Sequence, residues 1–206
     1  MVMKLIKISD KTLALIGFLV PLVAYVGIFS AINNAPWFSW TQNALSDLGN
    51  SQVHPESAPY FNMGLMTTGI LVTIFAIGIY SHMRNIVEKI GVILFILSGI
   101  SLFGIGFFPE HAKPWHYVFS VAFFALFGFA LLIIGIGFVI SKHNLLLGIW
   151  GIIAGIADAI IWLAVPWRSL GVTGVAIPEF LSSFFGVIWI LLYSIMLAKK
   201  AKLFHA

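Results

Sequence analysis

Side chains that can exchange protons are few and unevenly placed along this 206-residue chain. Carboxylates and imidazoles can act as general acids and bases, or can bind the charged part of a ligand. Three of them lie in or beside polar loops, and a fourth lies inside an apolar run. We take these four as candidate catalytic residues: Asp47, His116, Asp158 and Glu179. The elements around them decide which chemistry they can support.

Asp47 belongs to the polar stretch NALSDLGNSQVHPE, residues 43–56, which lies between two hydrophobic segments. In one interpretation, Ser46 and Asp47 accept hydrogen bonds from free backbone N–H groups of a turn and are purely structural. In the other, the stretch folds as a lid over a helix bundle and directs Asp47 towards His116 and Glu179. A lid would exclude water from a polar pocket and strengthen its electrostatic interactions. The sequence leaves both hypotheses open.

Asp158 lies deep in an apolar segment, about 10 Å from its outer end at the helical rise of 1.5 Å per residue. A charge at this depth costs a few kcal/mol unless it is paired, protonated or hydrated. Gly151 and Gly155 share its helical face, and small residues at this spacing are typical of closely packed helices. We therefore predict that Asp158 faces the protein interior. A protonated carboxyl with a structural role is the alternative interpretation.

Polar residues at helical spacing predict an internal cavity. Glu179, Ser182 and Ser183 share one face of a segment because they are three and four residues apart. Hydrogen bonds that only hold helices together are the alternative, at about 0.6 kcal/mol per contact. With other polar residues expected on the same side of the protein, they form our set of candidate ligand-binding residues: Ser46, Asn62, His111, Arg168, Ser182 and Ser183.

The histidines give a weak signal for a metal centre. Imidazole and carboxylate ligands suit zinc, which can activate water when one coordination position stays open. However, His111 and His116 are five residues apart rather than four, and the chain has no HExxH motif. We predict no metal and no other cofactor, with zinc as the alternative.

The composition indicates that membrane-spanning helices position these residues. The chain is 61% hydrophobic and 9% charged, with a mean hydropathy of +1.06, which leaves too little polar surface for a water-soluble domain. Apolar runs of about 20 residues can cross a bilayer as helices, whereas barrel strands would alternate every second residue. We predict an all-α integral membrane protein. It is a single six-helix bundle over residues 1–206, with helices near 12–32, 60–80, 90–108, 116–140, 145–165 and 178–198.

The basic residues predict the orientation of the bundle. With six spans, both termini share one side with residues 81–89 and 141–144, and that side carries nine lysines and arginines against two on the other. Because basic loops stay in the cytoplasm, we expect cytoplasmic termini and residues 33–58 outside, in a multi-pass protein of the cell membrane. The positive charge then faces anionic lipid rather than nucleic acid. Membrane lipids are the expected partners, with a membrane-protein partner or a second copy of the chain as alternatives.

Four motifs resemble a known family. They are NALSDLG at residues 43–49, the pair Phe61-Asn62, FFPEHAKPWH at residues 107–116, and Glu179 at the start of the last predicted helix. Together they are similar to the bacterial and archaeal membrane family known as domain of unknown function 998. The resemblance spans nearly the whole chain and implies a membrane fold, but no function.

A more distant similarity connects the chain with the eukaryotic Frag/DRAM/Sfk membrane family. It rests on SDLG at residues 46–49, the pair Pro55-Glu56, and His116 and Glu179 at two predicted helix starts. Leu48 stands where the eukaryotic motif usually has threonine. The resemblance implies six helices and a link to lipid remodelling of membrane anchors or to membrane trafficking, without a catalytic mechanism.

Three functions agree with these patterns. We rank first a polar site on the outer side of the bundle that binds or remodels a lipid. The second is a proton-coupled transporter that uses Asp158, although we find no internal repeat of the kind that is typical of such carriers. The third is a non-catalytic partner that stabilises or assembles another membrane protein. The sequence leaves open whether the protein is an enzyme.

Overall fold

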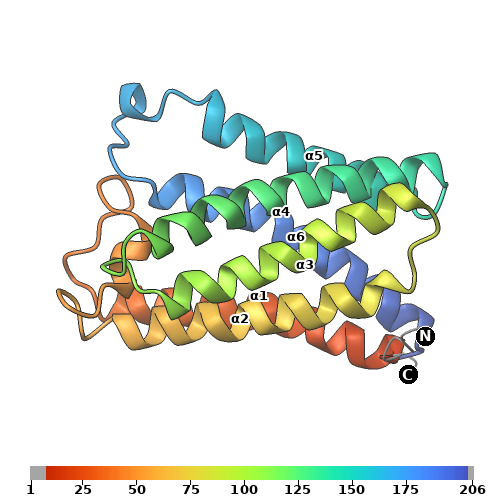
Figure 1. Cartoon of the computed structure of the whole chain (residues 1–206), viewed down its shortest axis with the longest axis horizontal. Coiled ribbons are helices and arrows are strands. Elements are labelled where there is room, and N and C mark those ends of the chain that lie inside the picture. The colour runs from red at the N-terminus through yellow and green to blue at the C-terminus, as the bar shows by residue number, and fades with distance from the viewer. Residues whose placement is uncertain (1–7, 204–206) are drawn as a thin grey trace.

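The computed structural model describes residues 8–203, which form six long helices lying side by side (Figure 1). The helices are α1 (Asp10–Asn33), α2 (Ala58–Tyr80), α3 (Ile86–Phe107), α4 (Trp115–Ile140), α5 (Leu145–Leu163) and α6 (Ala176–Lys200). Each is long and apolar enough to cross a membrane. The predicted all-α bundle of six spans is therefore confirmed. The largest difference in a boundary is at the start of α3, which begins at Ile86 rather than at residue 90.

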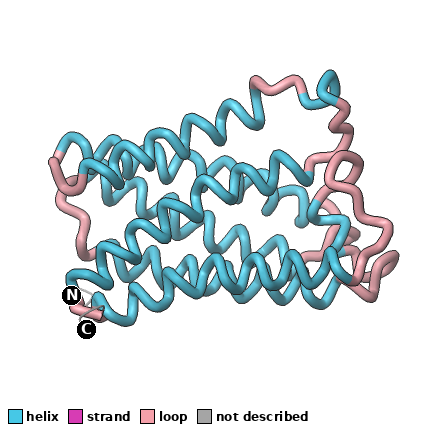
Figure 2. Tube along the Cα trace, turned by 180° about the vertical axis from the view of Figure 1, so that it is seen from behind, coloured by secondary structure: helices cyan, strands magenta, loops and turns pink. Residues whose placement is uncertain are grey.

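The connections divide the bundle into two unlike ends (Figures 1 and 2). At the short-loop end lie the start of α1, the end of α6 and the connections at 81–85 and 141–144. At the long-loop end lie the connections at 34–57, 108–114 and 164–175. Two of these long connections contain short 3-10 helices that the apolar pattern did not predict, η1 (Leu45–Gly49) and η2 (Trp167–Leu170).

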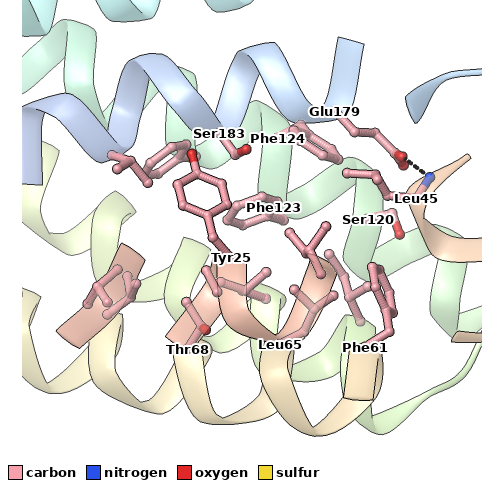
Figure 3. Close-up of a pocket in the computed structure, with 18 of the residues that line it drawn as sticks. Tyr25, Leu45, Phe61, Leu65, Thr68, Ser120, Phe123, Phe124, Glu179 and Ser183 are labelled. Carbon is pink, nitrogen blue, oxygen red and sulfur yellow. Dashed lines mark hydrogen bonds between the residues drawn. The ribbon is translucent and has the colours of Figure 1, made fainter. Parts of the chain in front are cut away.

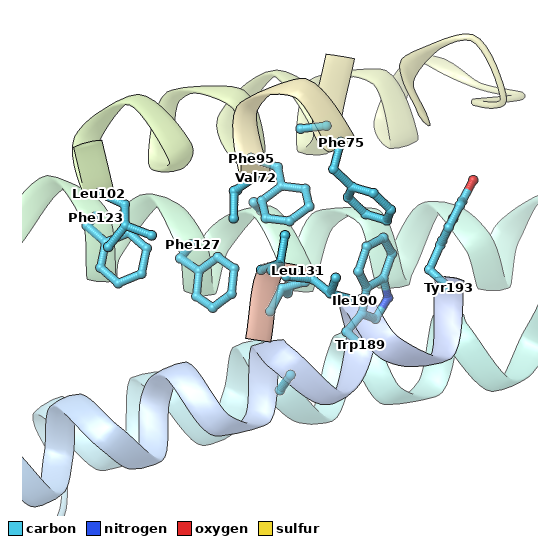
Figure 4. Close-up of a cluster of buried hydrophobic side chains, with 14 of the residues drawn as sticks. Val72, Phe75, Phe95, Leu102, Phe123, Phe127, Leu131, Trp189, Ile190 and Tyr193 are labelled. Carbon is cyan, nitrogen blue, oxygen red and sulfur yellow. The ribbon is translucent and has the colours of Figure 1, made fainter. Parts of the chain in front are cut away.

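Aromatic side chains fill the middle of the bundle (Figure 4). Phe75, Phe95, Trp189 and Tyr193 are fully buried, and the rings of Phe95 and Trp189 meet edge to face with their centroids 6.0 Å apart. The Trp189 indole N–H also donates to the carbonyl of Leu147, at 3.1 Å, which joins α6 to α5. Since lipid is as apolar as a leucine side chain, such packing and hydrogen bonds hold the helices together in a membrane.

Glycines bring α4 and α5 into close contact, as their spacing predicted. A Cβ atom on Gly151 would lie 2.8 Å from the carbonyl oxygen of Leu131, and one on Gly155 would lie 2.8 Å from that of Gly128. These are distances that real Cβ atoms do not show, so only glycine permits this approach. The face of α5 that carries Asp158 is thereby pressed against α4.

A buried carboxylate organises the short-loop end. Glu88 has no exposed surface, and its oxygens accept hydrogen bonds from Ser141 Oγ at 2.5 Å, Arg84 N at 2.6 Å and Asn85 Nδ2 at 3.0 Å. His143 Nδ1 lies 3.2 Å from the same carboxylate. Glu88 therefore joins the start of α3 to the connection between α4 and α5, a role that its place in the sequence did not reveal.

A second polar cluster joins the first and last helices at this end. Asp10 of α1 lies 2.8 Å from Lys200 Nζ of α6 and 3.2 Å from His82 Nε2. The other ring nitrogen of His82 lies 3.3 Å from the hydroxyl of Tyr193. Polar groups at the short-loop end therefore find partners within the protein.

Candidate functional site

A pocket of about 670 Å³ lies between α4 and α5 towards the long-loop end. Figure 1 shows that α5 diverges from its neighbours at this end. Much of its wall is apolar and aromatic, with side chains such as Phe124, Phe129 and Trp162. The polar side chains that line this α4–α5 pocket are Ser46, Glu110, Lys113, His116, Tyr117, Ser120, Asp158 and Glu179. Three of the four candidate catalytic residues therefore lie around one cavity.

The wall of the α4–α5 pocket continues onto the lipid-facing surface of the bundle. Val121 and Phe129 of α4 and Leu163 of α5 line the pocket, and each is at least half exposed. An apolar side chain that is exposed on a membrane-spanning helix faces acyl chains. The pocket therefore opens sideways, towards lipid, as well as carrying polar groups inside.

Asp158 lies on the inner wall of this pocket and is only 8% exposed. Its carboxylate packs directly against Gly128 of α4, where no room remains for a Cβ atom. The prediction that Asp158 faces protein rather than acyl chains is confirmed. Within residues 8–203, neither its Oδ1 nor the hydroxyl of Ser182 on α6 makes a hydrogen bond of standard geometry, although the two side chains lie close enough to interact.

His116 is held in one orientation at the start of α4. Its Nδ1 lies 2.7 Å from the carbonyl oxygen of Phe108, and because a carbonyl only accepts, Nδ1 must be the donor. The other nitrogen, Nε2, is then an acceptor in the neutral imidazole. Among the described residues Nε2 has no hydrogen-bond partner, and it belongs to a side chain that is 7% exposed and lines the α4–α5 pocket.

Glu179 connects the 43–56 segment to α6 (Figure 3). Its Oε2 accepts a hydrogen bond of 2.6 Å from the backbone N–H of Leu45 in η1. Nearby, the N–H groups of Val175 and Ala176 donate to the carbonyl of Asn43 at 3.1 and 2.9 Å. The segment is thus fixed against the first turn of α6.

Asp47 has a different role from the one that the lid hypothesis gave it. Its Oδ2 accepts hydrogen bonds from Ala44 N at 3.0 Å and from Asn43 Nδ2 at 2.9 Å, both within its own loop. The first N–H groups of a short helix have no partner inside it, and Asp47 is close enough to satisfy one. The structural interpretation therefore describes Asp47, and Glu179 makes the contact between the segment and a helix.

A second, smaller pocket of about 90 Å³ lies deeper, among α1, α2, α3, α4 and α6 (Figure 3). This inner pocket is almost wholly apolar, with the hydroxyl groups of Ser183 and Tyr25 on one side. Four residues line both pockets and form the partition between them: Ser46, Ser120, Phe124 and Glu179. Glu179 is therefore the ionisable side chain at the boundary between the two cavities.

Four candidate ligand-binding residues do not line either pocket: Asn62, His111, Arg168 and Ser182. Ser182 lies on α6 near Asp158. Asn62 of α2 donates from Nδ2 to the carbonyl of Gly49, at 2.9 Å, and so holds the end of η1. His111 is partly buried in the connection before α4, and Arg168 is exposed on η2. Their place on the same end of the bundle, which the sequence predicted, does not bring them into the cavities.

Two charged residues of the α4–α5 pocket were missing from our candidate sets. Glu110 lines the pocket and accepts a hydrogen bond of 2.9 Å from Asn50 Nδ2, and Lys113 lies beside it in the wall. Both belong to the FFPEHAKPWH motif, so the motif itself was the available signal. Within residues 8–203, no group of three or more histidine and acidic side chains is arranged to hold a metal ion.

Comparisons with known proteins identify a family but no function. No curated protein and no solved structure matches the chain. A family model described as "Protein of unknown function (DUF998)" matches residues 18–196, which reach from α1 to α6 and include every residue that lines the two pockets. Because the match covers most of the sequence and all six helices, the chain belongs to the DUF998 family.

Proposed function

We propose that the protein binds a membrane lipid in the α4–α5 pocket. The observation that carries the proposal is a cavity of about 670 Å³ that has most of its polar groups towards the long-loop end, has Asp158 deeper, and has an apolar wall that continues to the lipid-facing surface. Ligand pockets of 300–1,000 Å³ typically combine apolar walls with a few polar groups that fix orientation. A lipid has this same division into a polar headgroup and apolar chains.

The lipid enters from the outer leaflet of the cell membrane in this proposal. The pocket lies at the long-loop end, and the bias of nine basic residues to two supports a cytoplasmic short-loop end. Trp162 and Trp167 near the long-loop end of α5 suit the depth of lipid headgroups. A headgroup at the pocket would therefore lie at its usual depth in the bilayer.

Lipid binding explains the cavity better than proton-coupled transport does. A carrier needs a polar route to both sides, but at the short-loop end Glu88 and Asp10 are occupied by hydrogen bonds and ion pairs within the protein. The distant similarity to the Frag/DRAM/Sfk family, which stays a prediction, also favours lipid. Remodelling of the bound lipid would need a reacting bond near His116 and Asp158, so binding is the first step to test.

Native mass spectrometry of the protein purified in mild detergent tests the proposal. Ala159 lines the pocket, so Ala159→Trp should fill it and abolish retention of lipids that copurify with the wild type. The neighbouring Ile160 is 50% exposed on the outer surface and does not line the pocket, so Ile160→Trp is the matched control and should retain lipid. Equal retention by both variants would contradict lipid binding at this site.

A further inference from the structure

We infer that the α4–α5 pocket selects a phospholipid whose headgroup carries a primary ammonium group, an inference that rests on the function proposed above. Carboxyl groups outnumber basic side chains in the lining. Glu110, Asp158 and Glu179 contribute three carboxyl groups, whereas Lys113 contributes the one lysine or arginine in the wall. A cationic group is the natural counterpart of such a lining.

The polar atoms without partners also call for a hydrogen-bond donor. Asp158 Oδ1 is an acceptor when ionised, and His116 Nε2 is an acceptor in the neutral imidazole, whose Nδ1 donates to Phe108. Both side chains are more than nine-tenths buried and line the pocket. Burying an acceptor without a donor is unfavourable, so a ligand with N–H groups would supply the hydrogen bonds that these acceptors lack.

Two further carboxylates have one oxygen engaged and the other free of a protein hydrogen bond within the described residues. Glu179 uses Oε2 for the N–H of Leu45, and Glu110 uses Oε2 for Asn50. Each can therefore accept from a ligand without giving up the bond that holds its loop in place. An ammonium group, with three N–H donors, can bind acceptors at the outer end of the pocket, while Asp158, which packs against Gly128 twelve residues along α4 from His116, attracts it from greater depth.

Lys113 supplies the second feature of the inferred ligand. It is exposed at the edge of the same pocket, in the connection before α4. Lysine binds phosphate as a point charge, so it can hold the phosphodiester of a headgroup while the ammonium group reaches inward. A choline headgroup has the charge but no N–H donor, and a glycerol headgroup leaves the lipid anionic and lacks the cation.

A competition experiment tests this selectivity. Purified protein, depleted of lipid, is given equal amounts of phosphatidylethanolamine, phosphatidylcholine and phosphatidylglycerol with identical acyl chains, and bound species are counted by native mass spectrometry. We expect the ethanolamine lipid to be preferred about tenfold, the factor that one hydrogen bond to a charged group contributes. Asp158→Asn should reduce this preference, whereas Asp47→Asn, a carboxylate at the same end that caps its own loop, should not.

A second pair of variants is needed because Asp158→Asn changes a buried residue and could impair folding. Glu110→Gln lies in a connection rather than a helix and should also reduce the preference for the ethanolamine lipid. Its control is Glu56→Gln, an exposed carboxylate of the 43–56 segment that does not line the pocket. Wild-type selectivity in both Asp158→Asn and Glu110→Gln would overturn the inference.

The remaining outcomes separate this inference from the proposed function. If all three lipids bind equally and Ala159→Trp still abolishes binding, the inference is overturned while lipid binding stands. If no lipid binds, or Ala159→Trp has no effect, the proposed function itself fails. Soluble phosphoethanolamine is added in a further arm, and displacement of the lipid at similar concentration would overturn a lipid as the source of the ammonium group.

Discussion

Replacing Glu88 by alanine should destabilise the bundle strongly, although the residue is remote from both pockets. The carboxylate is completely buried and accepts hydrogen bonds from Ser141, Arg84 and Asn85, with His143 at 3.2 Å. Each buried donor that loses its partner costs about 1–3 kcal/mol, and relaxation or water recovers part of this. We therefore expect Glu88→Ala to lower the free energy of unfolding by about 3–5 kcal/mol, the range for breaking a buried charged pair.

The assay compares thermal unfolding in detergent, followed by circular dichroism, for wild type and variants. Glu88→Gln keeps one acceptor oxygen and should lose less, about 1–3 kcal/mol, so the order of Tm should be wild type, Gln, Ala. Glu56→Ala removes an exposed carboxylate and serves as the control. A Tm for Glu88→Ala equal to that of the control would refute the idea that the cluster holds α3 to the α4–α5 connection.

Three further predictions concern pH, packing and orientation. Burial lowers the pKa of His143 below its ordinary value, so the folded protein binds fewer protons than the unfolded chain at acidic pH. The Tm should therefore fall as the pH drops below about 6.5, and His143→Gln should weaken this dependence of Tm on pH. Gly69→Ala should cost about 1–3 kcal/mol in thermal unfolding, because its Cβ would lie 2.8 Å from the carbonyl of Gly99 and force α2 from α3. Since the chain has no cysteine, Ser51→Cys and Lys202→Cys can be labelled singly in intact cells with an impermeant reagent; only Ser51→Cys should react, and the reverse would disprove the proposed orientation.

The helices could be predicted from the sequence because their determinants are local. A run of about 20 apolar residues can satisfy its backbone in lipid only as a helix or a closed barrel, and the continuous runs favour the helix. Likewise, spacing alone places Gly151, Gly155 and Asp158 on one helical face. The burial of Asp158 could therefore be predicted without identifying the helix that packs against it. These inferences need no knowledge of how distant segments meet.

The long connections could not be predicted in the same way, because distant residues determine their conformation. The bond between Leu45 and Glu179 joins positions 134 residues apart, and the pairing of Asn43 with Val175 is comparably distant. The sequence identified Ser46 and Asp47 as polar turn residues, but not which of them would face a cavity. It is Ser46 that lines both pockets, whereas Asp47 serves its own turn.

Polar groups without hydrogen bonds are concentrated at the long-loop end of the bundle, whereas the buried polar groups described at the short-loop end are paired. Within residues 8–203, seven side chains have a buried polar atom without a hydrogen bond of standard geometry, and all seven lie in the half towards the long-loop end: Tyr25, Asn62, His111, His116, Asp158, Trp162 and Ser182. The buried Glu88 at the opposite end has several partners. Membrane proteins gain stability when buried polar groups are paired, so an end that leaves them unpaired gives up stability there. Such a loss is expected where a ligand completes the hydrogen bonds, and three of the seven residues, His116, Asp158 and Trp162, line the α4–α5 pocket.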